Sequence, residues 1–264
     1  MALETHTIIS NILYSILLMS WLHVDYKIMK MNNDINKIEY RMFDIIVCVS
    51  NAIKRVFLNY IPELKDKTKV IYNIIDRSTL NDSSLNEVPV KASNVFTITT
   101  VSRIDANKNI FDCIEIAKKL YDFKTNFVWY IIGDGISRKE VEKKALEYNL
   151  SENIFFLGYL DNPYPYIKKS DLCVSCSLSE SFGLFIYESL LLGTPVVARE
   201  YDAISEIMRD GKEGYVCVNA SDMFEKIFHL INDTEAYMSL KSNLAFYKDK
   251  NKKSIDGFYE VIYK

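Results

Sequence analysis

The sequence lacks an excess of either charge sign that would mark a nucleic-acid-binding surface or an acidic solubilising tail. It contains 32 basic and 35 acidic residues, which gives a net charge of −3, and only 3 histidines are present. We therefore expect no nucleic-acid partner. Hydrophobic residues make up 49% of the 264 positions and charged residues 25%, which predicts a packed core in one large domain or two small ones.

Long hydrophobic runs are also missing. The most apolar stretch, 8–22, is interrupted by Ser10, Asn11, Ser15 and Ser20. It falls short of the roughly 20 apolar residues that a membrane-crossing helix needs. The first residues contain neither a charged n-region nor a small-residue cleavage site, so no signal peptide is predicted. We expect 8–22 to form a buried helix and strand.

Cysteines are few and do not form a metal-site pattern. There are five, and a single CxxC, Cys173 and Cys176, has no second pair to complete a zinc site. Residues three apart on a strand also point to opposite faces. An odd number of thiols within apolar runs predicts buried, reduced cysteines in a cytoplasmic protein, and no metal.

Short apolar runs alternate with segments of helical period, which predicts an α/β fold with a parallel sheet covered on both faces. The expected strands are 44–49, 69–72, 95–101, 127–132, 153–157, 172–175 and 195–198. The expected helices are 51–60, 109–121, 137–148, 183–192, 220–231 and 234–247. The polar segment 77–94, which contains Pro89, is typical of a linker between a short part, 1–76, and a larger domain, 95–250.

Polar residues follow several of these strands, at the edge where doubly wound sheets bind ligands. After 95–101, Arg103 and Lys108 lie five apart, so both heads can converge on one anion. After 172–175, Gly183 opens a helix whose free N–H groups favour a phosphate. Glu180 precedes that helix and Glu188 lies about one turn inside it.

These groups together suit a nucleoside diphosphate that carries a sugar. Two cations and a helix N-terminus can neutralise the diphosphate, and two carboxylates can accept hydrogen bonds from sugar hydroxyls. After 127–132, Gly133 and Gly135 allow a close approach of backbone. They do not form a dinucleotide fingerprint, because Arg138 occupies its last glycine position.

At these residues the sequence resembles the retaining GT-B glycosyltransferases of group 1 (family 4). The resemblance is carried by an E-x7-E motif, Glu180 to Glu188 within SESFGLFIYESLLLGTPVVA, and by VSRIDANKN, IIGDG, NIFFLGYL and EIMRDGKEGYV in the same order. It covers 95–217 strongly and 19–76 moderately. It implies a GT-B-like fold, in which a partial Rossmann-like domain over 1–76 precedes the complete donor domain, and 251–264 forms a helix that packs back toward the first part.

The resemblance also implies residue roles. Arg103 and Lys108 would bind the donor diphosphate, Glu180 the transferred sugar and Glu188 the ribose. Gly158 and Tyr159 would lie near the base. Further donor-binding positions are Gly133, Ser181, Phe182, Gly183 and Leu184.

In WLHVDY, His23 would face the reacting sugar and, with Glu180, act in catalysis. Without the resemblance, His23 would be interpreted as a core histidine and the charges as solvated surface groups. The implied activity is transfer of a hexose from a UDP- or GDP-sugar to a glycan or lipid-linked acceptor, with retention and without metal or cofactor. No two aspartates lie two apart, so the metal-holding DxD of other glycosyltransferases is absent.

The family's first strands and glycine-rich loop have no counterpart, which leaves turnover by this chain in question. Two alternatives stay open: a nucleotide-sugar binding module without turnover, which includes a subunit that needs a partner chain, and a GT-B-fold sugar-nucleotide epimerase. Enzymes of the resembled family commonly serve polysaccharide biosynthesis. The expected location is therefore the cytoplasm, with peripheral association at the inner membrane surface as a further expectation.

Overall fold

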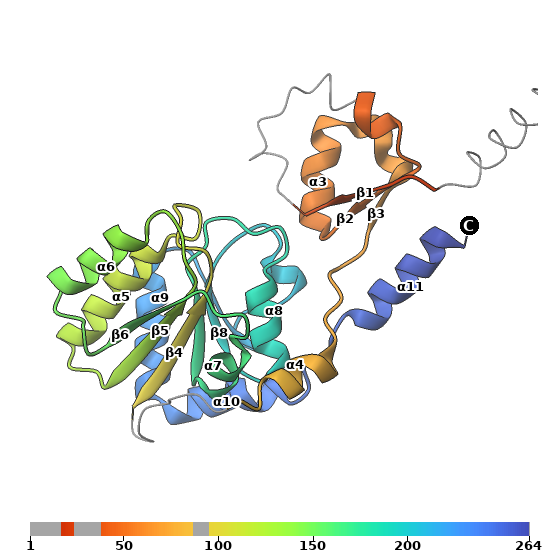
Figure 1. Cartoon of the computed structure of the whole chain (residues 1–264). Coiled ribbons are helices and arrows are strands. Elements are labelled where there is room, and N and C mark those ends of the chain that lie inside the picture. The colour runs from red at the N-terminus through yellow and green to blue at the C-terminus, as the bar shows by residue number, and fades with distance from the viewer. Residues whose placement is uncertain (1–16, 24–37, 87–94, 264) are drawn as a thin grey trace, which may run out of the picture. The chain divides into compact units, whose positions relative to one another are not determined.

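The computed structural model describes residues 17–23, 38–86 and 95–263, which belong to two compact units (Figure 1). One unit combines residues 1–74 with 250–264, and the other spans Ile75–Asp249. The second unit contains the segment 95–217, on which the functional prediction depends.

The larger unit is built on a six-stranded sheet in which every neighbouring pair of strands is parallel. Its strand order is β6-β5-β4-β7-β8-β9. The chain thus moves outward from β4 to one edge and then returns past β4 to the other edge. The order reverses between β4 and β7, and the carboxyl ends of these two strands form the switch point where such sheets bind ligands. The strands are β4 (Phe96–Val101), β5 (Phe127–Ile132), β6 (Ile154–Gly158), β7 (Leu172–Ser175), β8 (Val196–Arg199) and β9 (Gly214–Cys217).

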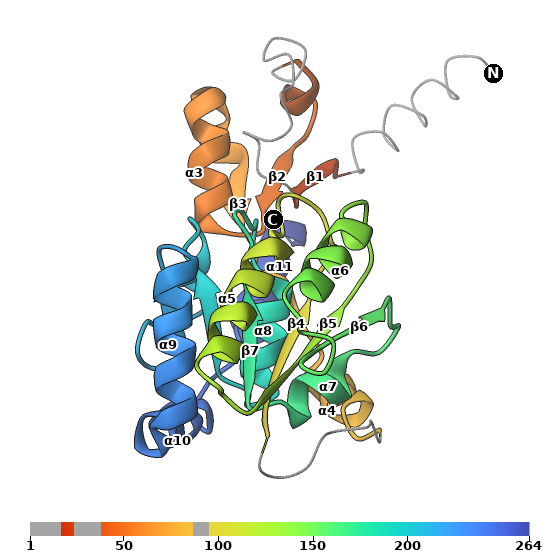
Figure 2. The same ribbon diagram turned by 90° about the vertical axis from the view of Figure 1, so that its left-hand side faces the viewer.

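Helices cover both faces of this sheet. In Figure 2, α5 (Ile110–Asp122), α6 (Arg138–Glu147) and α9 (Ala220–Asn232) lie side by side in front of the strands. On the other face lie α7 (Tyr164–Lys169) and α8 (Leu184–Leu191), and α10 (Thr234–Leu244) follows α9. Because both faces are covered, β5 is buried at all of its positions, as its unbroken apolar sequence predicts.

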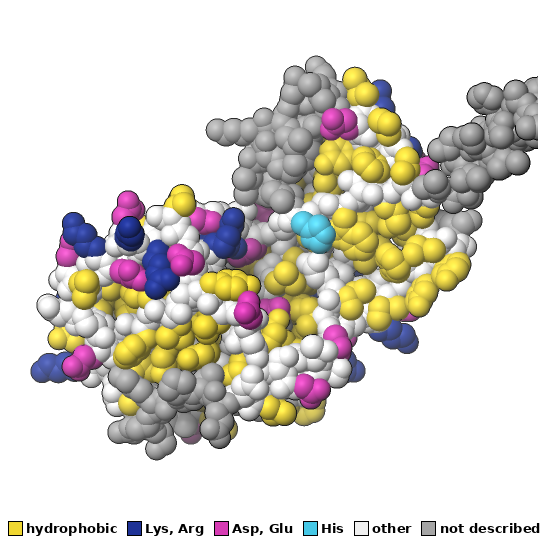
Figure 3. Space-filling view, in the orientation of Figure 1, with side chains coloured by type: hydrophobic (Ala, Val, Ile, Leu, Met, Phe, Trp, Pro, Cys, Tyr) yellow, Lys and Arg dark blue, Asp and Glu magenta, His cyan; other side chains and the backbone are white. Residues whose placement is uncertain are grey.

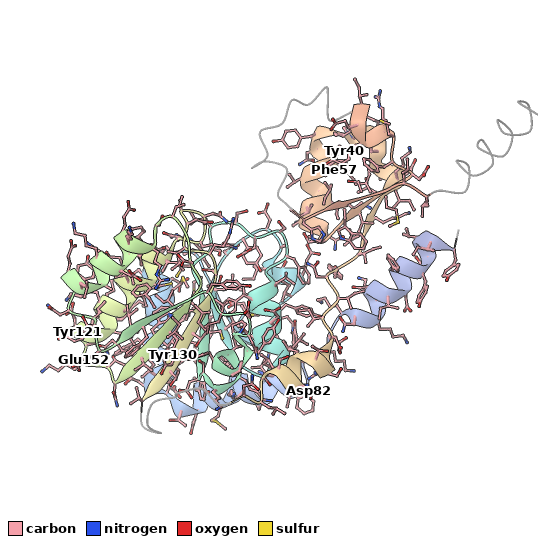
Figure 4. All side chains as sticks on the ribbon, viewed as in Figure 1. Tyr40, Phe57, Asp82, Tyr121, Tyr130 and Glu152 are labelled. Atoms are coloured by element: carbon pink, nitrogen blue, oxygen red, sulfur yellow. The ribbon has the colours of Figure 1, made fainter. Side chains whose placement is uncertain are left out.

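The core of this unit also contains polar groups that are paired. The fully buried Trp129 donates from Nε1 to Oγ1 of Thr100 at 3.0 Å, and Thr100 donates to the carbonyl of Val174 at 2.7 Å. On the opposite face of β5, Tyr130 packs its ring 5.3 Å from that of Tyr166 on α7 (Figure 4). These contacts lock β4, β5 and β7 together beneath the switch point.

The smaller unit contains a three-stranded parallel sheet in the order β1-β2-β3. Val47, Ile71 and Val261 form its small core, and the rings of Tyr40 and Phe57 meet edge to face at 5.1 Å (Figure 4). Val261 belongs to the last helix, so the end of the chain packs on this sheet. The elements are β1 (Met19–Leu22), β2 (Ile45–Cys48), α3 (Asn51–Tyr60), η1 (Pro62–Lys67), β3 (Thr68–Val70) and α11 (Asn251–Ile262).

Five elements of the structure were not predicted, namely α4 (Arg77–Ser83), α7, β9 and the 3-10 turns η1 and η2 (Ile204–Glu206). The predicted linker 77–94 begins with the helix α4, because Asp76 caps it through the N–H of Ser78 and the buried Leu80 anchors it. Residues 87–94 lie outside the described part. The short elements α7 and β9 were not predicted, since neither has a long periodic pattern. The 3-10 turn η2 lies between β8 and β9 in the sequence of the larger unit.

The apolar run 8–22 is described only from residue 17, where it leads into β1. Among the residues described, no helix combines the length and the apolar character that spanning a membrane requires.

Candidate functional site

The loops that follow β4 and β7 are joined at the switch point. The N–H of Leu178 donates to the carbonyl of Asn107 at 2.8 Å, and Nδ2 of Asn107 donates to the carbonyl of Ser179 at 3.0 Å. Nζ of Lys108 lies 2.5 Å from Oε1 of Glu180. Two predicted site residues that lie 72 positions apart in the sequence therefore form one ion pair.

The loop after β4 is shaped by Asp105. Its Oδ1 accepts from the N–H of Lys108 at 3.0 Å, and its Oδ2 lies 3.1 Å from Nη2 of Arg103. The Lys108 side chain is only 16% exposed, whereas that of Arg103 is 75% exposed. Both predicted cations thus belong to one loop, with Lys108 turned toward Glu180 and Arg103 toward solvent. Asn107 and Asp105 were not predicted as site residues.

Gly183 begins α8 in a backbone conformation that favours glycine, with φ of 92°. A Cβ at this position would lie 2.2 Å from Oη of Tyr201. That hydroxyl donates to the carbonyl of Phe182 at 3.1 Å and so supports the turn before the helix. Because the N-cap residue is a glycine, it has no side chain that could accept from the first N–H groups of α8. These groups can therefore donate hydrogen bonds to an anion.

Tyr201 was not predicted as a site residue, although the sequence contains a signal for it. It lies just beyond the carboxyl end of β8, the next strand of the sheet after β7. Phe182, predicted to bind donor, is buried and packs its ring edge to face against Tyr187 at 5.4 Å. It shapes the turn, whereas Leu184, at 47% exposure, lies at the surface of the first helical turn.

Glu188 lies one turn into α8, where Oη of Tyr164 donates to its Oε1 at 3.2 Å. Burial raises the pKa of Glu188 from 4.5 to about 7, and the Tyr164 hydrogen bond lowers it in part. Burial, then the nearby carboxylate, raises the pKa of Tyr164 to about 12, so its hydroxyl stays protonated. A carboxylate within this apolar helix needs a partner, and Tyr164 supplies it. The partner, on the unpredicted α7, could not have been found from the sequence.

The turn after β5 packs against the loop after β4 without room for side chains. A Cβ at Gly133 would lie 1.9 Å from the carbonyl oxygen of Ser102, and one at Gly135 would lie 2.3 Å from that of Ile104. The N–H of Gly133 also donates to the carbonyl of Gly158 at 2.7 Å. These contacts bring the ends of β4, β5 and β6 into one continuous backbone surface.

Charged and exposed residues border this surface. Arg138 forms ion pairs with Asp134 at 3.0 Å and Glu142 at 2.7 Å, within a region where both signs are interspersed (Figure 3). Tyr159, predicted near the base, is 75% exposed. Its ring is therefore accessible for stacking on a ligand.

His23 belongs to the smaller unit and is described only within it. Its ring is exposed beyond the end of β1 and lies 6.2 Å from that of Trp21. Its predicted place opposite the reacting sugar stays a prediction.

The five cysteines are free thiols and all of them are buried, as predicted. Cys113 Sγ lies 3.3 Å from Cys176 Sγ, beneath the two loops of the switch point. Within the described ranges, no group of three or more His, Cys, Asp or Glu side chains is placed to hold a metal ion.

Residues 83–245, more than half of the chain, match the protein family described as glycosyl transferases group 1. This chain belongs to that family. Among the curated relatives of this group 1 chain is the N-acetylgalactosamine-N,N'-diacetylbacillosaminyl-diphospho-undecaprenol 4-alpha-N-acetylgalactosaminyltransferase of Campylobacter jejuni. It is 26% identical over 198 residues, which cover 74% of this chain and 51% of that protein. An uncharacterised glycosyltransferase of Methanocaldococcus jannaschii is 32% identical over 213 residues, 76% of this chain and 53% of that protein.

Solved structures agree on the fold of this group 1 chain. A Staphylococcus aureus TarM mutant bound to UDP, fondaparinux and alpha-GlcNAc-glycerol superposes with a TM-score of 0.76 at 19% identity, covering 93% of this chain and 50% of that one. Anabaena HepE, in complex with UDP and glucose, gives 0.73 at 19% identity, covering 93% and 69%. The predicted GT-B-like α/β fold is therefore confirmed. The chain spans about half the length of the curated relatives it matches.

Proposed function

We propose that the 75–249 unit binds a nucleoside-diphosphate sugar and serves its transfer, with retention, to a glycan or lipid-linked acceptor. The observation that carries the proposal is the ion pair of Lys108 with Glu180, on the loop that leads into α8, whose first N–H groups follow Gly183. An ammonium paired with the loop before a helix, together with the N-terminus of that helix, suits phosphoryl oxygens. Bound UDP in the structures of TarM and HepE makes UDP the first nucleotide to test.

The ion pair gives the proposed donor site a defined first step. Without ligand, Glu180 neutralises Lys108 at 2.5 Å. An incoming diphosphate competes for the ammonium, and the Glu180 carboxylate is released to accept a hydrogen bond from a hydroxyl of the sugar. The contact between Lys108 and Glu180 is thereby exchanged for two contacts, Lys108 with the diphosphate and Glu180 with the sugar. This exchange favours the binding of an intact nucleotide sugar over the binding of either part alone.

Transfer breaks the bond from the sugar C1 to the β-phosphate oxygen and forms a bond from C1 to the acceptor oxygen on the same face. The acceptor proton passes to the departing phosphate. Negative charge grows on that phosphate, and Lys108, Arg103 and the N–H groups of α8 are proposed to stabilise it. In this proposal the two cations supply the positive charge that a metal provides elsewhere, so no metal is required. His23 is proposed to act on the acceptor side.

Ligand-induced thermal shifts test donor binding directly. We expect one nucleoside diphosphate among UDP, GDP and ADP, and not CMP, to raise the melting temperature of the full chain. Lys108→Gln and Arg103→Gln should each weaken binding about ten- to hundredfold, the loss of one charge-assisted hydrogen bond. Lys143→Gln is the matched control, since Lys143 is 79% exposed on α6. Unchanged affinity in both site variants would remove the diphosphate assignment.

A binding module without turnover is the second candidate, because the contacts that carry the proposal, Lys108 with Glu180 and the start of α8, would serve binding of a donor as well as its transfer. Incubation with the stabilising donor and NMR of the products separates the two candidates. Transfer to an added acceptor with the donor's anomeric configuration supports the transferase. Binding with no hydrolysis or transfer supports the module, and a changed sugar without acceptor supports an epimerase.

The acceptor class and location are proposals as well. The Campylobacter jejuni relative is named for an undecaprenol-linked acceptor, which motivates a lipid-linked acceptor at the inner membrane surface. Flotation of the chain with anionic vesicles, with and without a polyprenol-linked glycan, tests this location. Recovery of the chain only in the unbound fraction of both samples would refute it. A partner chain that completes the acceptor side would show itself as turnover that appears only on its addition.

A further inference from the structure

Tyr164 and Glu188 come from different helices of the larger unit and meet at their side chains. Tyr164 is the first residue of α7, and Glu188 lies in the middle of α8. The hydroxyl Oη donates to Oε1 of the carboxylate at 3.2 Å. Both side chains are partly buried, so the hydrogen bond is shielded from competing water more than a surface bond would be.

This bond leaves the two carboxylate oxygens in different states. Oε1 is engaged by Tyr164, while Oε2 of Glu188 has no hydrogen-bond partner among the described residues. A carboxylate with one oxygen fixed has lost much of its freedom to rotate, because the bonded oxygen selects one side-chain conformation. The second oxygen then has a fixed direction and full capacity to accept from a ligand.

The charge state of Glu188 depends on the same contact. Burial is the larger influence and raises its pKa to about 7, whereas the Tyr164 hydrogen bond acts in the opposite direction. No charged side chain of a described residue adds to these two causes. The hydroxyl therefore favours the ionised carboxylate, which is the form that accepts hydrogen bonds at both oxygens.

We propose that Tyr164 is a positioning residue: it holds one oxygen of Glu188 so that the other receives the vicinal hydroxyls of the donor's ribose. The inference rests on the proposed donor site and on the ribose contact that the family resemblance implies for Glu188; what it adds is the role of Tyr164. A vicinal diol presents two O–H donors to one carboxylate, and a carboxylate that could rotate would meet them in fewer of its conformations. Tyr164 touches neither substrate nor reacting atoms and acts through Glu188.

The test compares two nucleotides and two matched variants of the full chain. Tyr164→Phe removes the hydroxyl and keeps the ring, and Tyr166→Phe removes the same group two residues further along α7. Affinities for UDP, or for the diphosphate that stabilises the wild type, are measured beside those for its 2′,3′-dideoxy analogue. We expect Tyr164→Phe to weaken UDP about three- to tenfold, to leave the dideoxy analogue unchanged, and Tyr166→Phe to change neither.

A pH profile supplies the readout that a structural role would not move. In the wild type, the ratio of UDP affinity to dideoxy affinity should fall as the pH drops through about 7, where Glu188 becomes protonated. In Tyr164→Phe the midpoint should move to higher pH, because the bond that favours the ionised form is gone. The pH profile of the wild type tests the proposal even if the Tyr164→Phe variant folds poorly.

Equal losses for UDP and its dideoxy analogue in Tyr164→Phe would overturn the proposal, because the tyrosine would then act on the fold and not on the diol. A pH-independent wild-type ratio would overturn it too. If the wild type binds no nucleoside diphosphate, the donor function itself fails. If binding depends on Lys108 but not on Tyr164, only the present inference fails.

Discussion

Replacement of Glu188 by glutamine should stabilise the larger unit at alkaline pH even though it removes a proposed ligand contact. The carboxyl pKa is raised by burial from 4.5 to about 7, so the folded unit holds its proton more tightly than the unfolded chain does. The protonated Glu188 carboxyl contributes to the free energy of unfolding in full below pH 4.5, and this contribution is lost as the pH rises through about 7. Above that range the folded unit carries a desolvated charge that Glu188→Gln does not have.

The magnitude follows from the two pKa values. A difference of about 2.5 pH units corresponds to about 3 kcal/mol at most, and the partial exposure of the side chain reduces this to about 1–3 kcal/mol. The variant should therefore match the wild type near pH 4.5 and exceed it by this amount at pH 8. In a unit of this size the gain is about 2–10 °C in melting temperature. The amide oxygen of glutamine can still accept from Tyr164, so the packing is kept.

Thermal melts of both proteins from pH 4.5 to 8, without ligand, measure the effect. Glu147→Gln is the control for a change from carboxylate to amide at a surface position, because the Glu147 side chain is 51% exposed at the end of α6. A Glu188→Gln difference that is constant with pH would refute the reasoning, because the carboxyl would then titrate alike in the folded and unfolded states. Added UDP should narrow the gap at pH 8, since only the wild type keeps the ribose contact.

Three further outcomes follow from the backbone and the thiols. Gly183→Ala should lower both the melting temperature and the nucleotide affinity, because its Cβ would lie 2.2 Å from Tyr201 Oη. Gly193→Ala is the comparison, since its φ is 80° and its Cβ would have nothing within 4 Å. It should lose only the free energy of that backbone strain, about 1 kcal/mol. Gly133→Ala should be the most damaging of the three in melting experiments, since its Cβ would overlap a backbone oxygen at 1.9 Å and backbone cannot move aside as a side chain can. Ellman's reagent at pH 8 should label no cysteine in the native chain and all five after denaturation. The reason is that all five thiols are buried, and burial raises the pKa of Cys48, Cys173 and Cys217 to about 12. Rapid labelling of the native chain would contradict this.

Strands and helices with long apolar patterns could be predicted from the sequence within a residue or two. The run 127–132 is apolar at every position because both faces of β5 are covered, and 110–122 repeats its apolar residues at helical spacing. The E-x7-E spacing and the glycine that opens α8 are also local properties. Because a helix N-terminus beside basic residues attracts anions, these local properties are enough to indicate a phosphate site.

Short elements escaped prediction because too few residues carry their pattern. The helix α4 depends on one cap, Asp76, and one buried leucine, and α7 has only six residues. Tyr164 lies at the start of α7, so its contact with Glu188 depends on how two helices pack on the same face of the sheet. No spacing along the chain encodes that contact.

Amino-acid order alone determined which residues are candidates for holding a phosphate and a sugar, because the ends of parallel strands are marked by local polarity and glycine. Tertiary structure decided which of them meet. It paired Lys108 with Glu180 across 72 residues, supported the turn at Gly183 with Tyr201, and raised the pKa of Glu188 to about 7. Each of these effects depends on distance and burial in space, and the ion pair arises because β4 and β7 are neighbours in the sheet.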